Sequence, residues 1–222
     1  MALSGWANKN RKMLKVHTVP VTPFMQNCTV LECTETKQAV VCDCGDAQPV
    51  LKFIAQQDFE VVAVWATHGH LDHIGGTAEL VEELKVPFFF PQQDDFLRTT
   101  LPEHARNYGF PAVRVPEVTT NIDNIKELSF GNVKVEVRNC PGHTPGHVVF
   151  YCADADIVIA GDVMFNGSIG RTDFPRGSFS QLEQSIQEEM YSLPHKTVVH
   201  CGHGPTTTIG HEAKTNPFVK AK

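Results

Sequence analysis

The stretch ATHGHLDHIGG, residues 66–76, places His68, His70, Asp72 and His73 within six positions. Neutral imidazole nitrogens and carboxylate oxygens are ligands for zinc, iron and similar metals. Gly69 separates the first two histidines and permits the irregular backbone that lets both converge on one ion. Asp72 and His73 follow on the next turn and point elsewhere. The stretch therefore predicts ligands for two neighbouring ions.

Three further ligands are expected at the ends of apolar segments elsewhere in the chain. FEVVAVWAT, residues 59–67, leads into the histidine stretch, and similar segments lead into His143, Asp162 and His203. Loops at strand ends are where a sheet holds functional groups in place. We expect His143 to complete the first ligand group and His203 the second. Asp162 has two oxygens and is expected to bridge ions about 3.5 to 4 Å apart.

The other histidines of the chain have no such context. A lone histidine is usually a surface or core residue satisfied by hydrogen bonds, and we expect this of His17, His104, His195, His200 and His211.

Composition indicates an ordinary globular protein. The chain has 222 residues, of which 41% are hydrophobic and 20% charged, with a formal net charge of −6. This composition argues against disorder, and the negative charge does not favour nucleic-acid binding. No run reaches about 18 apolar residues, so no membrane-spanning helix is expected. No repeat or linker is evident, so we predict one domain over residues 1–222.

The seven cysteines favour a reducing compartment. Their number is odd and their spacing follows no small-domain disulfide framework. The amino-terminal segment MALSGWANKNRKMLKV lacks the apolar centre of a signal peptide. We therefore expect a cytoplasmic protein with reduced thiols. Cys44, Cys140 and Cys201 lie near the predicted ligands in sequence, and two interpretations stay open: small buried apolar residues, or redox-sensitive or metal-binding thiols.

Hydrophobic periodicity predicts alternating strands and helices. Apolar, β-branched segments predict strands over residues 13–21, 28–33, 39–44, 59–67, 86–90, 133–139, 148–152, 156–162 and 196–204. Helical spacing predicts helices over residues 48–57, 77–84 and 178–193, with a helix and surface loop within 92–118. In the helix over 178–193, Ser180 with Glu183 predicts a capping box at the amino terminus.

These motifs resemble those of the metallo-β-lactamase superfamily. THGHLDH resembles its T-H-x-H-x-D-H signature, and PGHTPGH, AGDVMF and CGHGP look like its later motifs in the same order. The resemblance implies an α/β fold, an αββα four-layer sandwich with two mixed β-sheets and metals at one edge. It implies one metal on His68, His70 and His143, a second on Asp72, His73 and His203, and Asp162 as the bridge. Asp43 matches an aspartate that holds a ligand histidine in position.

The loop GSIGRTDFPRGS narrows the resemblance to two groups, single-domain glyoxalase II-like (hydroxyacylglutathione hydrolase) proteins of bacteria and persulfide dioxygenases. The tail GHGPTTTIGHEAKTNPF resembles the hydrolases, and Pro175 stands after Phe174 where the dioxygenases generally have glutamine. We therefore favour a metal-dependent hydrolase of acyl thioesters, with S-lactoylglutathione as the expected substrate. The alternative is a mononuclear iron persulfide dioxygenase using His68, His143 and Asp162. A non-catalytic metal-binding protein on the same fold is the third hypothesis.

The hydrolase interpretation assigns roles to several residues. Two metals, expected to be zinc although iron or manganese also fit these ligands, lower the pKa of a shared water, and the resulting hydroxide attacks the thioester. Asp72 and Asp162 are the expected catalytic carboxylates. Arg171 occupies a place comparable to that of a basic residue that contacts glutathione in larger family members, although a structural salt bridge with Asp173 is the alternative. We expect no carboxy-terminal helical glutathione-binding domain like that of those enzymes, so the thiol stays open. The acyl group and the oligomeric state also stay open.

Overall fold

Neighbouring strand residues face two different hydrophobic cores. In the computed structural model, which describes residues 13–222, Val40 belongs to one buried cluster and Val41 to another. The same alternation separates Phe150 from Val149 in the second half of the chain. Strands buried on both faces need a covering layer on each side. Residues 1–12 lie outside the described residues, and the prediction that the chain has no signal peptide rests largely on them.

The first half of the chain forms a mixed six-stranded sheet in the order β1-β2-β3-β4-β5-β6. The first three strands are antiparallel, and β3 to β6 are parallel. Their bounds are β1 Leu14–Val21, β2 Gln26–Cys33, β3 Gln38–Cys42, β4 Glu60–Trp65, β5 Phe88–Phe90 and β6 Thr120–Asn121.

The second half forms another mixed six-stranded sheet in the order β14-β13-β10-β9-β8-β7. Within it β10 and β13 are parallel, and the other neighbours are antiparallel. The bounds are β7 Glu127–Phe130, β8 Val133–Asn139, β9 Val148–Cys152, β10 Ile157–Gly161, β13 Val198–Cys201 and β14 Thr207–Thr208. A small hairpin, β11 Met164–Phe165 with β12 Ser168–Ile169, follows β10.

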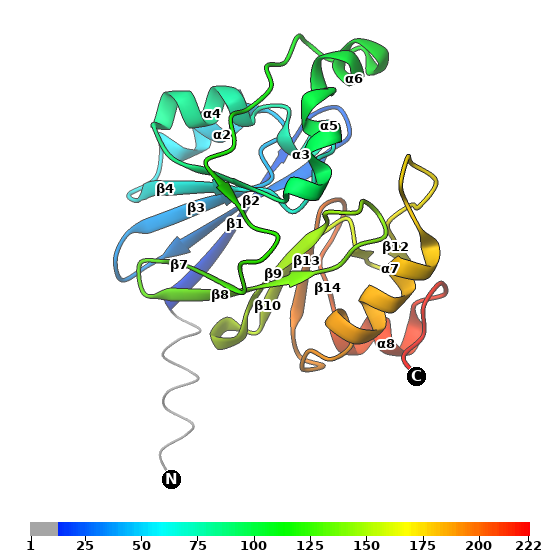
Figure 1. Ribbon diagram of the computed structural model, residues 1–222. Coiled ribbons are helices and arrows are strands. Elements are labelled where there is room, and N and C mark those ends of the chain that lie inside the picture. Colours follow the sequence, from blue (N-terminus) through cyan, green and yellow to red (C-terminus); the bar gives the residue numbers. More distant parts are fainter. Residues whose placement is uncertain (1–12) are drawn as a thin grey trace.

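Helices cover the outer face of each sheet (Figure 1). Those of the first half are α2 Ala47–Ile54, α3 Leu71–Ile74, α4 Thr77–Leu84, α5 Asp95–Thr99 and α6 Leu101–Tyr108, with the 3₁₀ turn η1 Gln92–Asp94 before α5. Those of the second half are α7 Phe179–Ser185, continued by a π-helical turn Ile186–Met190, and α8 Ile209–Thr215. A short 3₁₀ turn, η2 Ala153–Ala155, joins β9 to β10.

Three buried clusters fill the spaces between the four layers. Trp65 and Phe150 pack between the two sheets. Leu80 and Leu101 pack under the first helical layer, and Leu182 and Ile209 pack under the second. The predicted αββα sandwich with two mixed sheets is confirmed. No helix within residues 13–222 is both long enough and apolar enough to cross a membrane.

Hydrogen bonds join the two halves at one edge of the sandwich. Asn27 N–H donates to the carbonyl of Gly202 at 2.7 Å, and Val148 N–H donates to the carbonyl of Thr67 at 2.9 Å. The strands β4, β8, β10 and β13 end shortly before His68, His143, Asp162 and His203, as the sequence predicts. The two sheets therefore bring these four loops together.

One predicted helix start was wrong. The amino-terminal cap of α7 is Ser178, whose side chain accepts a hydrogen bond from Gln181 N–H, and Ser180 lies within the first turn. Both serines are followed three residues later by Gln or Glu, so the motif alone does not choose between them. The extension of the single domain to all 222 residues and the cytoplasmic location stay predictions.

Candidate metal centre

The loop after β4 is anchored by Asp43, a residue that lies beyond the end of β3 with a left-handed backbone, φ 61°. Its buried carboxylate accepts hydrogen bonds from Thr67 N–H and from the Thr67 hydroxyl, both at 2.7 Å. It also accepts one from His73 Nδ1 at 3.0 Å. Asp43 thus fixes both ends of the turn that carries the four clustered residues, and it contacts a predicted ligand histidine as expected.

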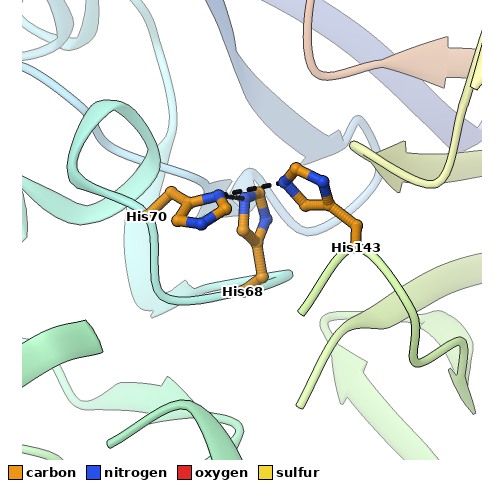
Figure 2. Close-up of side chains that lie close together, drawn as sticks. All are labelled: His68, His70 and His143. Atoms are coloured by element: carbon orange, nitrogen blue, oxygen red, sulfur yellow. Dashed lines mark hydrogen bonds between the residues drawn. The ribbon is translucent and has the colours of Figure 1, made fainter. Parts of the chain in front are cut away.

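The first predicted ligand group converges in space (Figure 2). His70 Nδ1 lies 3.1 Å from His68 Nε2 and 2.9 Å from His143 Nε2. His70 is the residue before α3, with an extended backbone, so its ring turns back toward His68 across Gly69. Nitrogens bound to one tetrahedral ion lie about 3.3 Å apart, given metal–nitrogen bonds of about 2.0–2.1 Å. The spacing of the three histidines suits a single ion.

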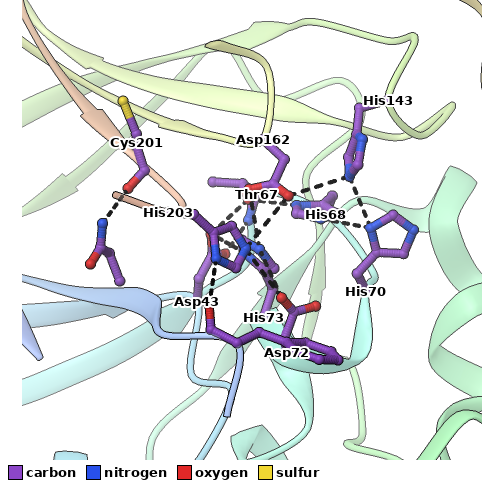
Figure 3. A network of polar contacts seen from close by, with 12 residues as sticks. Asp43, Thr67, His68, His70, Asp72, His73, His143, Asp162, Cys201 and His203 are labelled. Atoms are coloured by element: carbon purple, nitrogen blue, oxygen red, sulfur yellow. Dashed lines mark hydrogen bonds and ion pairs between the residues drawn. The ribbon is translucent and has the colours of Figure 1, made fainter. Parts of the chain in front are cut away.

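The second group lies beside the first (Figure 3). Potential ligand atoms of Asp72, His73 and His203 lie within 4.8 Å of one another. Asp72 and His73 come from α3, and His203 comes from the loop after β13. Gly202 permits this approach, because a Cβ there would lie 2.2 Å from Asp162 Oδ1.

Asp162 lies between the two groups. Its Oδ1 is 3.3 Å from His73 Nε2, and its Oδ2 is 3.6 Å from His143 Nε2 and 3.7 Å from His203 Nε2. A carboxylate that lies within 3.7 Å of histidine nitrogens from both groups has the placement that a bridging ligand requires. The structure thus brings all seven predicted ligands together.

The proton positions of four histidines follow from their outer partners. Carbonyl oxygens only accept, so His143 Nδ1–H donates to Arg171 O at 2.7 Å, and His203 Nδ1–H donates to Phe24 O at 3.1 Å. His73 Nδ1–H donates to the Asp43 carboxylate. The Thr67 hydroxyl gives its proton to Asp43, so it accepts from His68 Nδ1–H at 3.0 Å. In the neutral form of each ring, Nε2 then presents a lone pair to the centre, as in metal-binding imidazoles.

These contacts suit a cation at the centre better than hydrogen bonds alone. His70 Nδ1 faces two deprotonated nitrogens with at most one proton to give. Among the described residues, the buried atoms His73 Nε2 and Asp162 Oδ1 have no hydrogen-bond partner although they face each other. Buried polar atoms are rarely left unpaired. The residues present therefore fit bound divalent ions.

The charges of the site point the same way. Burial and the neighbouring imidazole of His143 lower the pKa of His70 to about 3, and burial lowers the pKa of His68 and His143. These three side chains are neutral at neutral pH and can donate lone pairs. Burial lowers the pKa of His73, but the carboxylates of Asp162 and Asp72 outweigh it and raise that pKa well above its ordinary value, so without a metal the ring is positively charged. Burial raises the pKa of Asp162, but the charge of His73, with His143 and His203, outweighs it and holds that pKa well below its ordinary value. Asp162 is therefore a stable carboxylate.

Two residues around the ligands were not predicted as site residues. His147 is buried and stacks on His68 at 4.6 Å between ring centroids, and its Nε2 accepts a hydrogen bond from Asp162 N–H at 3.1 Å. It is the second histidine of the PGHTPGH motif, which was the signal available in the sequence. Asp94 is the other, and no motif in the sequence singles it out.

Arg171 is paired within its own loop. Its guanidinium contacts both oxygens of Asp173 at 2.6 Å and stacks over Phe174, 4.2 Å from the ring centroid. This contact is the salt bridge that the sequence left as the alternative to glutathione binding. The Phe174 ring also lies 4.8 Å from the His70 ring. The loop therefore borders the first ligand group, and binding of substrate by Arg171 stays a prediction.

The cysteines near the motifs are core residues. All seven are free and buried. Cys44 and Cys140 belong to hydrophobic clusters, and Cys201 Sγ contacts the carbonyl of Val199 at 3.9 Å. None of the potential metal-ligand groups among residues 13–222 includes a cysteine. The histidines expected to be ordinary are also absent from these groups, and His17 pairs with Glu32 at 2.8 Å.

Comparison with known proteins matches the amino-acid sequence to a family. The sequence profile described as the metallo-beta-lactamase superfamily matches residues 21–203. The chain belongs to the metallo-β-lactamase superfamily. Members of this superfamily bind divalent metals, and this chain has histidine and aspartate groups that could hold metal ions.

Members of this superfamily similar to the chain include one with a named activity. Hydroxyacylglutathione hydrolase GloC from Haemophilus influenzae is 35% identical over 212 residues, which cover 94% of this chain and all of GloC. The solved structure of TTHA1623 in a di-iron-bound form is 36% identical, with a TM-score of 0.83 over 91% of this chain and all of that one. The structure of BLEG-1 B3 metallo-beta-lactamase is 31% identical, with a TM-score of 0.82 over 92% of this chain and 99% of that one.

Proposed function

We propose that the protein is a two-metal hydrolase of acyl thioesters of the glyoxalase II type, with S-lactoylglutathione as its substrate. The observation that carries the proposal is the pair of adjacent ligand groups that share Asp162. The similarity to hydroxyacylglutathione hydrolase GloC, which extends over nearly the whole of both chains, supports the choice of substrate.

The residues would hold the two ions in distinct ways. His68, His70 and His143 would bind one, Asp72, His73 and His203 the other, and Asp162 both. When bound, such ions make water nucleophilic near neutral pH and polarise a carbonyl. The outer hydrogen bonds that His73, His143 and His203 donate to Asp43, Arg171 O and Phe24 O keep these three imidazoles in the ligand tautomer.

Asp72 and the leaving group complete the chemistry. The Asp72 side chain is 16% exposed and lies 3.2 Å from His203 Nε2, so its carboxylate borders the open side of the site. There it is placed to orient the attacking water. The water oxygen forms a bond to the acyl carbon as the carbon–sulfur bond breaks. The thiolate leaves and takes up one water proton in solvent, and the other proton is released to solvent from the new carboxylic acid. Because thiols have a pKa near 8.5, the thiolate is a stable leaving group without a dedicated general acid.

The test is an assay of purified protein whose metal content is known. Protein loaded with zinc, iron or manganese is given S-lactoylglutathione, and loss of the thioester is followed with release of glutathione. Hydrolysis that scales with two bound metal equivalents is the expected result. No hydrolysis by fully loaded protein would reject the proposal.

The same preparations distinguish the other activities. Oxygen uptake with glutathione persulfide by protein holding one iron would support the dioxygenase hypothesis. Cleavage of a chromogenic β-lactam would support an activity like that named for BLEG-1. Bound metal without turnover of any of these substrates would favour the non-catalytic hypothesis.

A further inference from the structure

A buried carboxylate outside the ligand set, that of Asp94, accepts three hydrogen bonds. Gly69 N–H donates to its Oδ2 at 3.0 Å, the Thr144 hydroxyl donates to the same oxygen at 2.6 Å, and Gly146 N–H donates to Oδ1 at 2.7 Å. The side chain is fully buried. All three partners are donors, so the carboxylate is satisfied in its charged form.

These three donors come from the two loops that carry the first ligand group. Gly69 stands between His68 and His70 in the loop after β4 of the first sheet. Thr144 and Gly146 follow His143 in the loop between β8 and β9 of the second sheet. Asp94 itself lies in η1, after β5. One side chain therefore connects the two halves of the sandwich at the three-histidine group.

Gly69 and Gly146 lie too close to Asp94 for either glycine to carry a side chain. A Cβ at Gly69 would lie 3.0 Å from Asp94 Cβ and 2.9 Å from Leu97 Cβ. A Cβ at Gly146 would lie 2.8 Å from Asp94 Oδ1. Both loops are thus packed directly on Asp94, and its position sets theirs.

We propose that Asp94 is a positioning residue that fixes His68, His70 and His143 at the spacing needed to bind one metal ion. The proposal rests on the proposed function in that these three histidines must bind metal. An asparagine at position 94 has the same shape, but its amide N–H₂ would replace one of the two oxygens. In the place of Oδ1 it would face Gly146 N–H, and in the place of Oδ2 it would face Gly69 N–H. The loops would then separate, and the three nitrogens would lose their common centre.

The test compares the metal affinity of wild type with that of Asp94→Asn. It also compares the single variant His203→Ala with the double variant His203→Ala/Asp94→Asn, because His203→Ala leaves the three-histidine group complete. Zn²⁺ affinity is read by competition with a chromophoric chelator, and Co²⁺ geometry by its visible absorption spectrum. We expect Asp94→Asn to weaken Zn²⁺ binding roughly ten- to hundredfold, as the loss of outer partners of metal ligands does. The Co²⁺ spectrum should change with it.

Glu212→Gln is the matched control. Glu212 is also fully buried and accepts hydrogen bonds from Thr207, Asn216 and Gly167, but these do not adjoin the three histidines. It should lower stability without changing Zn²⁺ affinity in the His203→Ala background. If Asp94→Asn does not fold, Thr144→Val, which removes one donor only, is used and should weaken binding severalfold.

The outcomes separate this inference from the proposed function. If the single variant His203→Ala, with Asp94 intact, does not bind Zn²⁺, the proposed metal centre itself is wrong. If His203→Ala binds Zn²⁺ and adding Asp94→Asn, or Thr144→Val in its place, leaves the affinity unchanged, Asp94 has no positioning role. Equal losses in Glu212→Gln and Asp94→Asn would also overturn the inference, because general destabilisation would then explain both.

Discussion

At the scale of single residues, Asp162 is the group on which the two-metal proposal depends. Its carboxylate lies next to histidines of both ligand groups, and the charges around it hold its pKa well below the ordinary value. We expect Asp162→Asn to lose one metal equivalent and to lower thioester turnover by about a hundredfold or more, because the variant keeps the shape but loses the charge between two dications. Elemental analysis and steady-state kinetics measure both.

Asp173→Asn is the control for metal content. Asp173 is an exposed aspartate of the next loop that pairs with Arg171, and it has no contact with the ligand groups among the described residues. The variant should keep both metals. Retention of two metals and full turnover by Asp162→Asn would end the two-metal mechanism.

We also expect the stability of the fold to depend on pH through Asp94. Burial raises its pKa to about 6, against the hydrogen bonds from Thr144, Gly146 and Gly69, and the charge of Asp123 raises it further. The folded form then binds more protons than the unfolded form between about pH 4 and pH 6, given an unfolded pKa near 3.9. The contribution of Asp94 to stability is therefore present at low pH and is lost as pH rises through about 6.

Urea denaturation of metal-free wild type and Asp94→Asn across this range measures the effect. We expect the stability of the wild type relative to the variant to fall as pH rises from 4 to 6 and then to level. A difference that is constant with pH would contradict the raised pKa. If the fall is seen, the ionised carboxylate destabilises the fold, as expected of a residue retained for its role at the site.

At the scale of elements, the start of α7 tests how the helix is capped. Ser178 has an extended backbone and caps Gln181 N–H, whereas Ser180 is helical. Loss of a serine cap costs about 1 kcal/mol, so we expect Ser178→Ala to lower the free energy of unfolding by about that amount. Ser180→Ala, an exposed helical position, should change it by less than about 0.5 kcal/mol. Equal effects of the two substitutions would contradict Ser178 as the cap. Chemical denaturation of both variants is the measurement.

At the scale of the whole molecule, burial should protect every cysteine. All seven are buried, and burial raises the pKa of Cys152 to about 11 and of Cys201 to about 12. At Cys33 burial also raises the pKa, but hydrogen bonds with Thr36, Asn132 and Glu35 outweigh it and lower that pKa, so there protection rests on burial alone. Thiolates are the reactive form, so we expect the native protein to react slowly with Ellman's reagent. Seven equivalents should react in denaturant. Rapid modification of a thiol in the folded protein would show that the cysteines are more than core residues.

Removal of metal should leave the fold intact. The three hydrophobic clusters lie between layers and do not depend on the ligand residues. We expect chelation to preserve the far-ultraviolet circular dichroism and to lower the melting temperature, since a ligand that binds only the folded state stabilises it. Added Zn²⁺ should restore the melting temperature. Loss of the dichroism signal on chelation would mean that the metals are required for folding.

Residue type and order along the chain were enough to predict much of this protein. Alternating and continuous apolar segments predict the strands because each sheet is buried on both faces. The ligand types stand directly after those strands, so their convergence could be expected from connectivity. Helix α8 and the strands β6, β7, β11, β12 and β14 were missed, because strands of two to four residues carry little periodic signal and the tail has little apolar pattern.

Apart from Asp43, the partners that prepare the ligands were decided by tertiary structure alone. His143 and His203 are held in their tautomers by the backbone carbonyls of Arg171 and Phe24, and any residue at those positions offers the same carbonyl. Asp94 likewise acts through the amides of Gly69 and Gly146, far from it in sequence. A hydrogen bond to the backbone leaves no trace in residue identity. The sequence therefore determined which atoms can bind metal, and only the folded chain determined which groups hold those atoms in place.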